Sequence, residues 1–186
     1  TTQMAEGMVL ELIHTNNLEV DEETYRNILI NKTAILISAA CQTGAIWGGS
    51  GEPEERALAE YGLDIGIAFQ MVDDLLDYEA SEQETGKTVA NDFKEGKITL
   101  PVIQALRCCS PEERSAVDRA VKKPVPEPED IRLVFDLVGR YGGLEYTREK
   151  ALDYKKQAQD CLNIFPPGED RQVLLDLADF VVERRK

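Results

Sequence analysis

Apolar residues recur with a helical period along most of the 186-residue chain. Spacings of three and four residues between apolar positions are typical of helices that bury one face. This pattern predicts eight helices, over residues 4–14, 22–47, 54–78, 100–108, 111–122, 128–141, 144–165 and 169–185. We find no alternating segment that predicts a strand and no internal repeat. The sequence therefore predicts an all-α fold, with long helices packed around a shared core or cavity.

The segment from residue 79 to residue 98 interrupts this helical pattern. It is polar and contains Gly86 and Gly96, so we expect a long loop there. Loops of this length inside a compact domain are uncommon and usually functional. The loop is therefore a place to look for binding residues.

The composition is that of one globular domain spanning residues 1–186. Hydrophobic residues make up 42% of the chain, and 35 acidic residues outnumber 21 basic ones, for a net charge of −14. Such a surface repels nucleic-acid phosphates, so no nucleic-acid partner is expected. No apolar run approaches the ~20 residues that cross a bilayer, and the start of the chain lacks the basic segment of a signal peptide. We expect a cytoplasmic protein.

The cysteines and the single histidine form no recognisable metal or disulfide pattern. Cys41 and Cys161 are isolated, while Cys108 and Cys109 are adjacent and badly placed to pair with each other. Neither a disulfide framework nor a thiolate zinc site is expected, which agrees with a reducing cytosol. His14 is interpreted as a surface or packing residue.

The most informative stretch is GIAFQMVDDLLDY, at residues 66–78. On a helix, Gln70, Asp73, Asp74 and Asp77 share one face. Three carboxylates on one face repel each other unless a cation or a proton neutralises them. The apolar neighbours indicate a helix packed on most sides, with its carboxylates facing a cavity. Mg²⁺ suits such a site, because it takes few protein carboxylates and leaves positions for water and phosphate oxygens. The alternative is the solvated acidic face of an ordinary helix.

Two glycine–lysine steps follow this helix, Gly86-Lys87 and Gly96-Lys97. Glycine lets the backbone approach an anion, and lysine is a compact positive charge for phosphate. An acidic face followed by these steps favours a metal–polyphosphate site. The GxxxxGK[ST] pattern of a P-loop is absent. The alternative is a pair of surface lysines in a loop.

Lys32 lies within an otherwise apolar helix and is followed by Thr33. Its side chain either reaches out to the surface along its methylene stem or points into the cavity and holds an anion. The pattern leaves both alternatives open.

Taken in order, these motifs resemble the trans-isoprenyl diphosphate synthases, also called the polyprenyl synthetase family. The resemblance runs through YRNILINKTA at 25–34, YG at 61–62, the acidic motif at 66–77, GK at 86–87 and GKITLP at 96–101. It covers essentially the whole chain as the carboxy-terminal part of that family, and it looks closest to bacterial long-chain synthases of the octaprenyl type. The combination FQxxDDxxD with KT, GK and GKxTLP is highly specific.

This resemblance implies a helical bundle of the isoprenoid-synthase type around a central cavity. It implies a Mg²⁺-dependent prenyltransferase that condenses isopentenyl diphosphate with an allylic diphosphate to make a polyprenyl diphosphate. The implied Mg²⁺ ligands are Asp73, Asp74 and Asp77. Residues implied to hold the allylic diphosphate are Lys32, Lys87 and Lys97, and those beside the allylic cation are Thr33 and Gln70. The terminal Arg184, Arg185 and Lys186 are expected near the isopentenyl diphosphate.

Two departures from the family pattern affect these expectations. Members commonly carry Glu or Gln at the position of Met8, so a polar cavity contact is expected to be lost. The family's first aspartate-rich motif is not in this sequence, so the chain alone is expected to be inactive. It would act in a homodimer, or in a heteromer with a chain that carries that motif, with at most peripheral membrane contact. A non-catalytic subunit and a terpene cyclase of the same fold are the alternatives.

Overall fold

The computed structural model describes residues 2–83 and 90–184, apart from the side chains of residues 80–83. In these ranges every regular element is a helix, which confirms the predicted all-α fold. The elements are, in chain order, α1 (Thr2–Ile13), α2 (Glu22–Leu29), the π-helical η1 (Ile30–Ala34), α3 (Ile35–Trp47), α4 (Glu52–Gln83), α5 (Asn91–Lys94), α6 (Leu100–Cys108), α7 (Pro111–Val121), α8 (Pro128–Arg140), α9 (Gly143–Cys161), the 3₁₀ turn η2 (Leu162–Ile164) and α10 (Glu169–Glu183).

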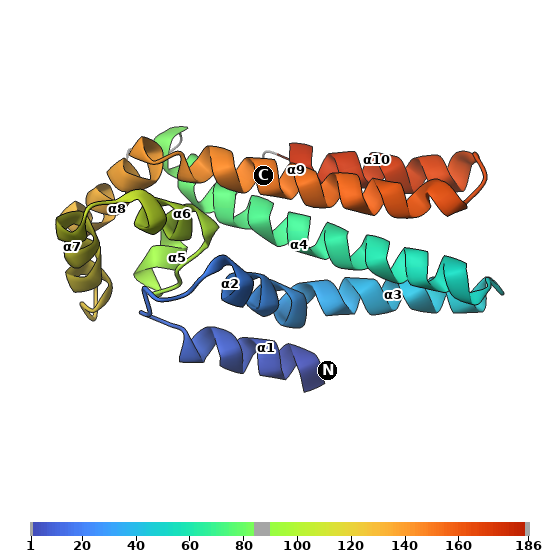
Figure 1. Ribbon diagram of the computed structural model, residues 1–186, viewed down its shortest axis with the longest axis horizontal. Helices are drawn as coiled ribbons and strands as arrows, with labels where there is room; N and C mark the ends of the chain where they lie inside the picture. The colour runs from blue at the N-terminus through green and yellow to red at the C-terminus, as the bar shows by residue number, and fades with distance from the viewer. Residues whose placement is uncertain (1, 84–89, 185–186) are drawn as a thin grey trace.

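Helix α4 is the central element of the molecule (Figure 1). It packs along α3 on one side and along α9 on the other, and α10 packs against both α4 and α9. Helices α2 and α3 continue one another through η1, and α1 packs against η1. The short helices α5 to α8 gather at one end of the long ones, as Figure 1 shows. The carboxy-terminal half of α4 therefore lies between η1 and that group of short helices.

Close approach of α4 to α3 depends on two glycines one helical turn apart. A Cβ added at Gly62 would lie 2.8 Å from the carbonyl oxygen of Ile37, and one added at Gly66 would lie 2.5 Å from the Cα of Ala34. Side chains at these positions would push α4 away from η1 and α3. The glycines therefore set the distance across which residues of η1 reach α4.

Two apolar clusters hold the helices together. The larger one joins α2, α4 and the short helices, and its most buried large members include Tyr78, Phe93 and Leu100. The smaller one joins α4, α9 and α10 around Tyr61 and Leu162, which are 1% and 0% exposed. Burial of this apolar surface is the main stabilising contribution to the fold.

The structure differs from the predicted elements in three places. Helix α4 runs to Gln83, five residues past the predicted end at Tyr78, because residues 79–83 contain no glycine or proline to stop it. The expected loop at 79–98 contains the short helix α5. A π-helical turn interrupts the long helix predicted over 22–47, and apolar periodicity alone does not reveal such an insertion.

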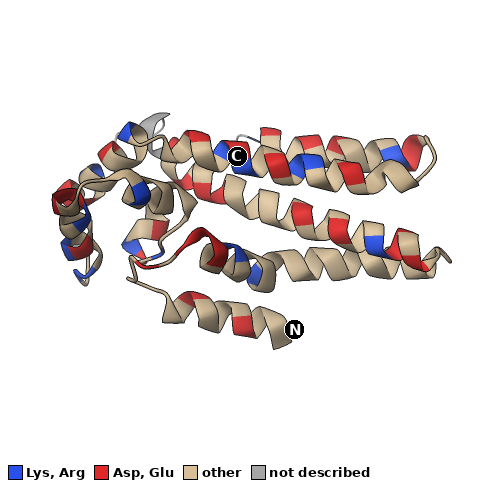
Figure 2. Cartoon of the chain, in the orientation of Figure 1, with Lys and Arg blue, Asp and Glu red and all other residues tan. Residues whose placement is uncertain are grey.

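The helical stretch at 22–47, formed by α2, η1 and α3, is unusually apolar in its second half. Figure 2 shows α3 without a charged side chain, whereas acidic residues occur along α4. By length and composition Glu22–Trp47 qualifies as a membrane-spanning helix, although we expected no such run. One helix of this kind is weak evidence, because the core helix of a soluble protein passes the same test. All four cysteines are free.

Candidate functional site

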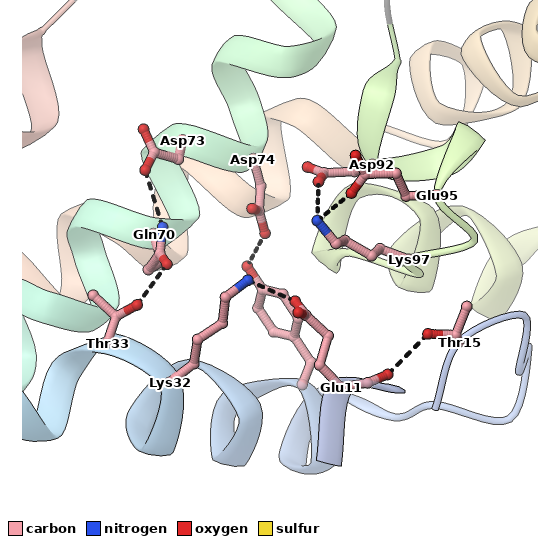
Figure 3. Close-up of polar contacts among 11 residues, drawn as sticks. Glu11, Thr15, Lys32, Thr33, Gln70, Asp73, Asp74, Asp92, Glu95 and Lys97 are labelled. Carbon is pink, nitrogen blue, oxygen red and sulfur yellow. Dashed lines mark hydrogen bonds and ion pairs between the residues drawn. The ribbon is translucent and has the colours of Figure 1, made fainter. Parts of the chain in front are cut away.

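A polar cavity of about 230 Å³ lies between α1, α2, η1, α4 and the segment around α5. Figure 3 shows polar side chains from these elements pointing toward one another. The charged side chains that line the cavity are Glu11, Lys32, Asp73, Asp74, Asp92 and Lys97. Four carboxylates against two lysines leave the cavity with an excess of negative charge.

Two of the predicted acidic residues of α4 line this cavity. Asp73 and Asp74 face it together with Gln70, one turn earlier on the same helix. The apolar residues between and beyond them point elsewhere: Met71 and Leu75 are 1% and 2% exposed. The helix is packed on most sides as predicted, and two of its three predicted acids face the cavity.

Asp77, the third predicted metal ligand, has a different environment. It is not among the cavity-lining residues. Its Oδ2 accepts a hydrogen bond from the main-chain N–H of Asp92 at 3.0 Å. This bond ties α5 back to α4 and so places the side chain of Asp92 at the cavity.

Lys32 and Thr33 lie in η1, where the helix widens into a single π-helical turn. Such turns are frequently found at functional sites. The hydroxyl of Thr33 donates to Oε1 of Gln70 at 2.7 Å, and Nε2 of Gln70 donates to Oδ2 of Asp73 at 3.0 Å. Figure 3 shows these two bonds in sequence. They connect η1 to the acidic face of α4.

Tyr25 makes a second connection between this long helix and α4. Its hydroxyl donates to Oδ2 of Asp74 at 2.5 Å. Burial, followed by the negative charge of Asp74, raises the pKa of Tyr25 well above its usual value. Burial, followed by repulsion from Asp92, also raises the pKa of Asp74 well above its usual range. A carboxylate that is costly to charge in this setting is stabilised by a nearby cation.

Lys32 and Lys97, two of the lysines predicted to bind the diphosphate, are paired with carboxylates. Nζ of Lys32 lies 2.8 Å from Oε1 of Glu11, and Nζ of Lys97 lies 2.6 Å from Oε2 of Glu95 and 3.4 Å from Oδ1 of Asp92. The Lys32 side chain lines the cavity and is 32% exposed, so it does not reach out along the surface. Burial lowers the pKa of Lys97, but its bond to Glu95 and the charge of Asp92 outweigh burial and raise it.

Arg184, predicted near the isopentenyl diphosphate, lies against Asp73, one of the predicted metal ligands. Its guanidinium forms an ion pair with Asp73 and donates to the main-chain oxygen of Phe69 at 2.9 Å. It also stacks over the ring of Phe69, 3.9 Å from the ring centre. A protein cation thus contacts a carboxylate that we predicted to bind metal. Lys87, Arg185 and Lys186 lie outside the described residues.

The structure adds three residues to which the sequence analysis gave no role. Glu11 is the partner of Lys32, Tyr25 is the donor to Asp74, and Asp92 lies within the loop predicted to be functional. A signal for Tyr25 was available: it precedes Lys32 by seven residues, about two helical turns. Nothing in the local pattern distinguishes Glu11 from other acidic residues.

The donor set of the cavity fits a hard divalent cation. Its ligating groups are carboxylate oxygens, with an amide oxygen from Gln70. Burial and repulsion from Asp77 raise the pKa of Asp92, although the positive charge of Lys97 lowers it. This shift agrees with the excess of negative charge in the cavity. Within residues 2–83 and 90–184, no three acidic, His or Cys side chains converge tightly enough to hold a metal ion. Protein donors instead contact these carboxylates: Arg184 and Gln70 contact Asp73, and Tyr25 contacts Asp74.

Comparison with known sequences relates the chain to one protein family. The sequence model of the polyprenyl synthetase family matches residues 1–138. The octaprenyl diphosphate synthase of Escherichia coli (strain K12) is 37% identical over 185 residues, which cover 97% of this chain and 56% of that protein. The chain thus spans little more than half the length of this curated relative.

Solved structures agree with the sequence comparison. A decaprenyl diphosphate synthase from Rhodobacter capsulatus superposes with a TM-score of 0.92 at 41% identity, over 100% of this chain and 57% of that one. A polyprenyl synthase from Caulobacter crescentus CB15, complexed with calcium and isoprenyl diphosphate, gives a TM-score of 0.90 at 37% identity, over 100% and 56%. A relative with the same arrangement of helices therefore binds a divalent metal together with an isoprenyl diphosphate.

Proposed function

Since the chain belongs to the polyprenyl synthetase family, we propose that its acidic cavity binds a magnesium-complexed allylic diphosphate in a prenyltransferase site. The observation that carries this proposal is that Asp73 and Asp74 share one cavity with Lys32 and Lys97. Acidic and basic side chains around one space suit an anion that is bound together with a cation. The complex of the Caulobacter crescentus relative with calcium and isoprenyl diphosphate supports it.

The proposed reaction condenses isopentenyl diphosphate with an allylic diphosphate. The allylic C–O bond ionises, the double bond of isopentenyl diphosphate attacks the resulting carbocation, and a proton is lost to the departing diphosphate. Mg²⁺, when bound, neutralises the charge that grows on the leaving diphosphate. Asp73 and Asp74 hold this ion, and Asp77 supports the site through its bond to α5.

The two cavity lysines hold the diphosphate itself. Lys32 and Lys97 each pair with carboxylates in the structure, so a diphosphate offers them a more highly charged partner in place of Glu11 and Glu95. Charge-assisted hydrogen bonds of this kind are about twice as strong as neutral ones. They contribute most as negative charge develops on the leaving group.

Thr33 and Gln70 lie beside the allylic carbon chain in this proposal, where positive charge develops. Because the Thr33 hydroxyl donates its proton to Gln70, its oxygen lone pairs remain to face positive charge. Neutral oxygen dipoles stabilise an allylic cation without forming a covalent bond to it. Lys87 and Arg185 are further proposed diphosphate contacts.

Residues 1–186 are proposed to form a single all-helical domain, the carboxy-terminal part of a polyprenyl synthetase domain. Helices α9 and α10, which follow residue 138, pack on α4 and so belong to the same unit. We propose a cytoplasmic enzyme that works as a homodimer, or as a heteromer with a chain bearing the family's first aspartate-rich motif. Its membrane contact would be peripheral and serve product release.

A condensation assay tests this function. The chain is joined to the amino-terminal part of a family relative and supplied with Mg²⁺, labelled isopentenyl diphosphate and an allylic diphosphate. We expect labelled polyprenyl diphosphate, and we expect its loss in a variant that carries both Asp73→Asn and Asp74→Asn. Equal product from that variant, or no product from a folded parent fusion, would contradict the proposed function.

A further inference from the structure

Helix α2 presents one buried hydroxyl to the acidic face of α4. Tyr25 is 3% exposed, and its O–H donates to Oδ2 of Asp74 at 2.5 Å. The two residues are 49 positions apart in sequence. This bond holds one oxygen of the Asp74 carboxylate at a fixed place relative to α2. The orientation of this carboxylate therefore depends on Tyr25.

The start of α2 is itself anchored to two other helices. Glu22, one turn before Tyr25, accepts hydrogen bonds from the hydroxyl of Tyr146 at 2.7 Å and from Arg107 at 3.1 Å. Lys150 lies 3.3 Å from its other carboxylate oxygen. These partners belong to α6 and α9, and α9 packs along α4. A closed frame of α2, α9 and α4 thus fixes the position of the Tyr25 hydroxyl relative to Asp74.

Fixing one oxygen of a carboxylate has a direct geometric consequence. The group is planar, so a bond to Oδ2 sets the rotation of the side chain and the direction of Oδ1. Metal ligands held in this way by an outer hydrogen bond bind their ion more tightly than freely rotating ones. Side-chain rotation that is already restricted also lowers the entropy lost on binding.

We propose that Tyr25 is a positioning residue, which orients the Asp74 carboxylate for the metal–diphosphate complex. The inference rests on the proposed function, in which Asp74 is a metal ligand. Tyr25 lines the cavity, but its hydroxyl is committed to Asp74, and it acts on binding through that carboxylate. The alternative is that its hydroxyl merely satisfies a buried polar group and has no influence on binding.

Another buried tyrosine offers a matched control. Tyr61 is 1% exposed, and its hydroxyl donates to the main-chain oxygen of Leu174 at 2.8 Å, between α4 and α10. Neither residue lines the acidic cavity. Tyr61→Phe therefore removes a hydroxyl of the same kind and burial without touching the site.

The test is calorimetric titration of Mg²⁺ into the 186-residue chain at a fixed, saturating concentration of inorganic pyrophosphate. We expect Tyr25→Phe to weaken the apparent affinity for Mg²⁺ by about 10-fold, the usual effect of losing an outer hydrogen bond to a ligand. Tyr61→Phe is expected to stay within about twofold of the parent. The phenylalanine ring refills the space of the tyrosine ring, and circular dichroism supplies the folded fraction that corrects each constant.

A double-mutant cycle separates positioning from a general loss of stability. If Tyr25 acts through Asp74, Tyr25→Phe has no further effect on Mg²⁺ affinity once Asp74→Asn is present. Three results would overturn the inference and leave the proposed function standing. The first is that Tyr25→Phe still weakens Mg²⁺ binding 10-fold when Asp74→Asn is present. The others are that Tyr25→Phe and Tyr61→Phe weaken it equally, or that Tyr25→Phe leaves it unchanged. No joint binding of Mg²⁺ and pyrophosphate by the parent chain would overturn both.

Discussion

Arg184 forms an ion pair with Asp73, so that a guanidinium from the end of α10 contacts a carboxylate proposed to bind metal. Its stacking on Phe69 and its bond to the Phe69 main chain hold it in that place. The side chain of Arg184 is 13% exposed and that of Asp73 is 41% exposed, so water screens the pair from the Asp73 side. In the structure, Arg184 neutralises part of the charge that Mg²⁺ is proposed to neutralise.

Replacing the Arg184 guanidinium is expected to change the thermal stability of the metal-free chain and the stabilisation gained on binding metal in opposite directions. Arg184→Gln should lower the thermal stability of the metal-free chain, because Asp73 loses its cationic partner. The same change should enlarge the stabilisation gained from Mg²⁺ with pyrophosphate, because the ion no longer displaces a protein cation. Thermal unfolding with and without the two ligands measures both effects. A smaller ligand-induced gain in the variant would instead assign Arg184 to diphosphate binding.

Lys32→Gln is expected to weaken pyrophosphate binding in the presence of Mg²⁺ by roughly 10- to 100-fold. This corresponds to about 1.5–3 kcal/mol for one hydrogen bond to a charged group. Calorimetric titration of pyrophosphate at saturating Mg²⁺ gives the dissociation constant. The physical reason is that the Lys32 ammonium lines the cavity and is held there by Glu11.

A second paired lysine serves as the control for this titration. Lys155 pairs with Asp179 at 2.9 Å between α9 and α10, and its side chain is 21% exposed. Lys155 does not line the cavity, so Lys155→Gln removes the same charge outside it and should leave pyrophosphate affinity within about twofold. Equal losses in the two variants would mean that net charge, and not the position of Lys32, governs binding.

Packing of α1 against η1 requires a residue without a side chain at Gly7. An added Cβ would lie 2.5 Å from the main-chain nitrogen of Lys32 and 2.7 Å from the carbonyl carbon of Asn31. Gly7→Ala should therefore lower the free energy of unfolding by at least ~2 kcal/mol, because backbone must move to admit the methyl group. It should also weaken pyrophosphate binding, since η1 carries Lys32. Urea unfolding measures the first effect.

Gly139→Ala is the matched control for Gly7→Ala. A Cβ there meets nothing within 4 Å, and the residue lies in the helix α8. Gly139→Ala is expected to stabilise the chain by about 0.5–1 kcal/mol through helix propensity alone. A destabilisation of similar size at both positions would contradict the proposed close contact at Gly7.

Asp64 is expected to make the stability of the fold depend on pH. Burial, with repulsion from Glu60, raises the pKa of Asp64 from 3.8 to about 6. The folded state therefore binds the proton more tightly than the unfolded state, and stability falls as pH rises from about 4 to 6. Asp64→Asn should remove this fall and gain about 1 kcal/mol at pH 7, after allowance for the solvent screening of a partly exposed group.

Urea unfolding at pH 4, 5, 6 and 7 measures that difference. The exposed aspartate Asp153 of α9 is the control, because Asp153→Asn removes a carboxylate of the same kind from the surface. A parent and an Asp64→Asn variant with parallel pH profiles would show that Asp64 titrates alike in the folded and unfolded states.

The sequence predicts the helices and the acidic face well because both depend on local periodicity. Asp73 and Asp74 follow from their spacing with Gln70 and from the apolar residues around them. The apolar pattern ends α4 too early, at Tyr78, because residues 79–83 are polar but compatible with helix. Polarity alone does not end a helix, whereas glycine or proline often does.

The partners of the site residues were not predictable in the same way. Glu11 reaches Lys32 only because Gly7 lets α1 approach η1, and Tyr25 reaches Asp74 across 49 residues. The π-helical turn that carries Lys32 leaves no mark in the apolar pattern. Contacts of this kind depend on how whole helices pack; the spacing of Tyr25 and Lys32 indicates a shared helix face but not what either residue contacts.

Thermal unfolding with Mg²⁺ and inorganic pyrophosphate, added singly and together, tests the central claim that this cavity binds a metal–diphosphate complex. At about 100 times the dissociation constant, joint binding stabilises the fold by about 2.7 kcal/mol, which raises Tm by roughly 5–10 °C for a chain of this size. We predict that gain only with both ligands, its loss in a variant carrying Asp73→Asn and Asp74→Asn, and its retention in Asp179→Asn, far from the cavity. The same gain in the Asp73→Asn, Asp74→Asn variant, or a full gain from either ligand alone, would contradict the account.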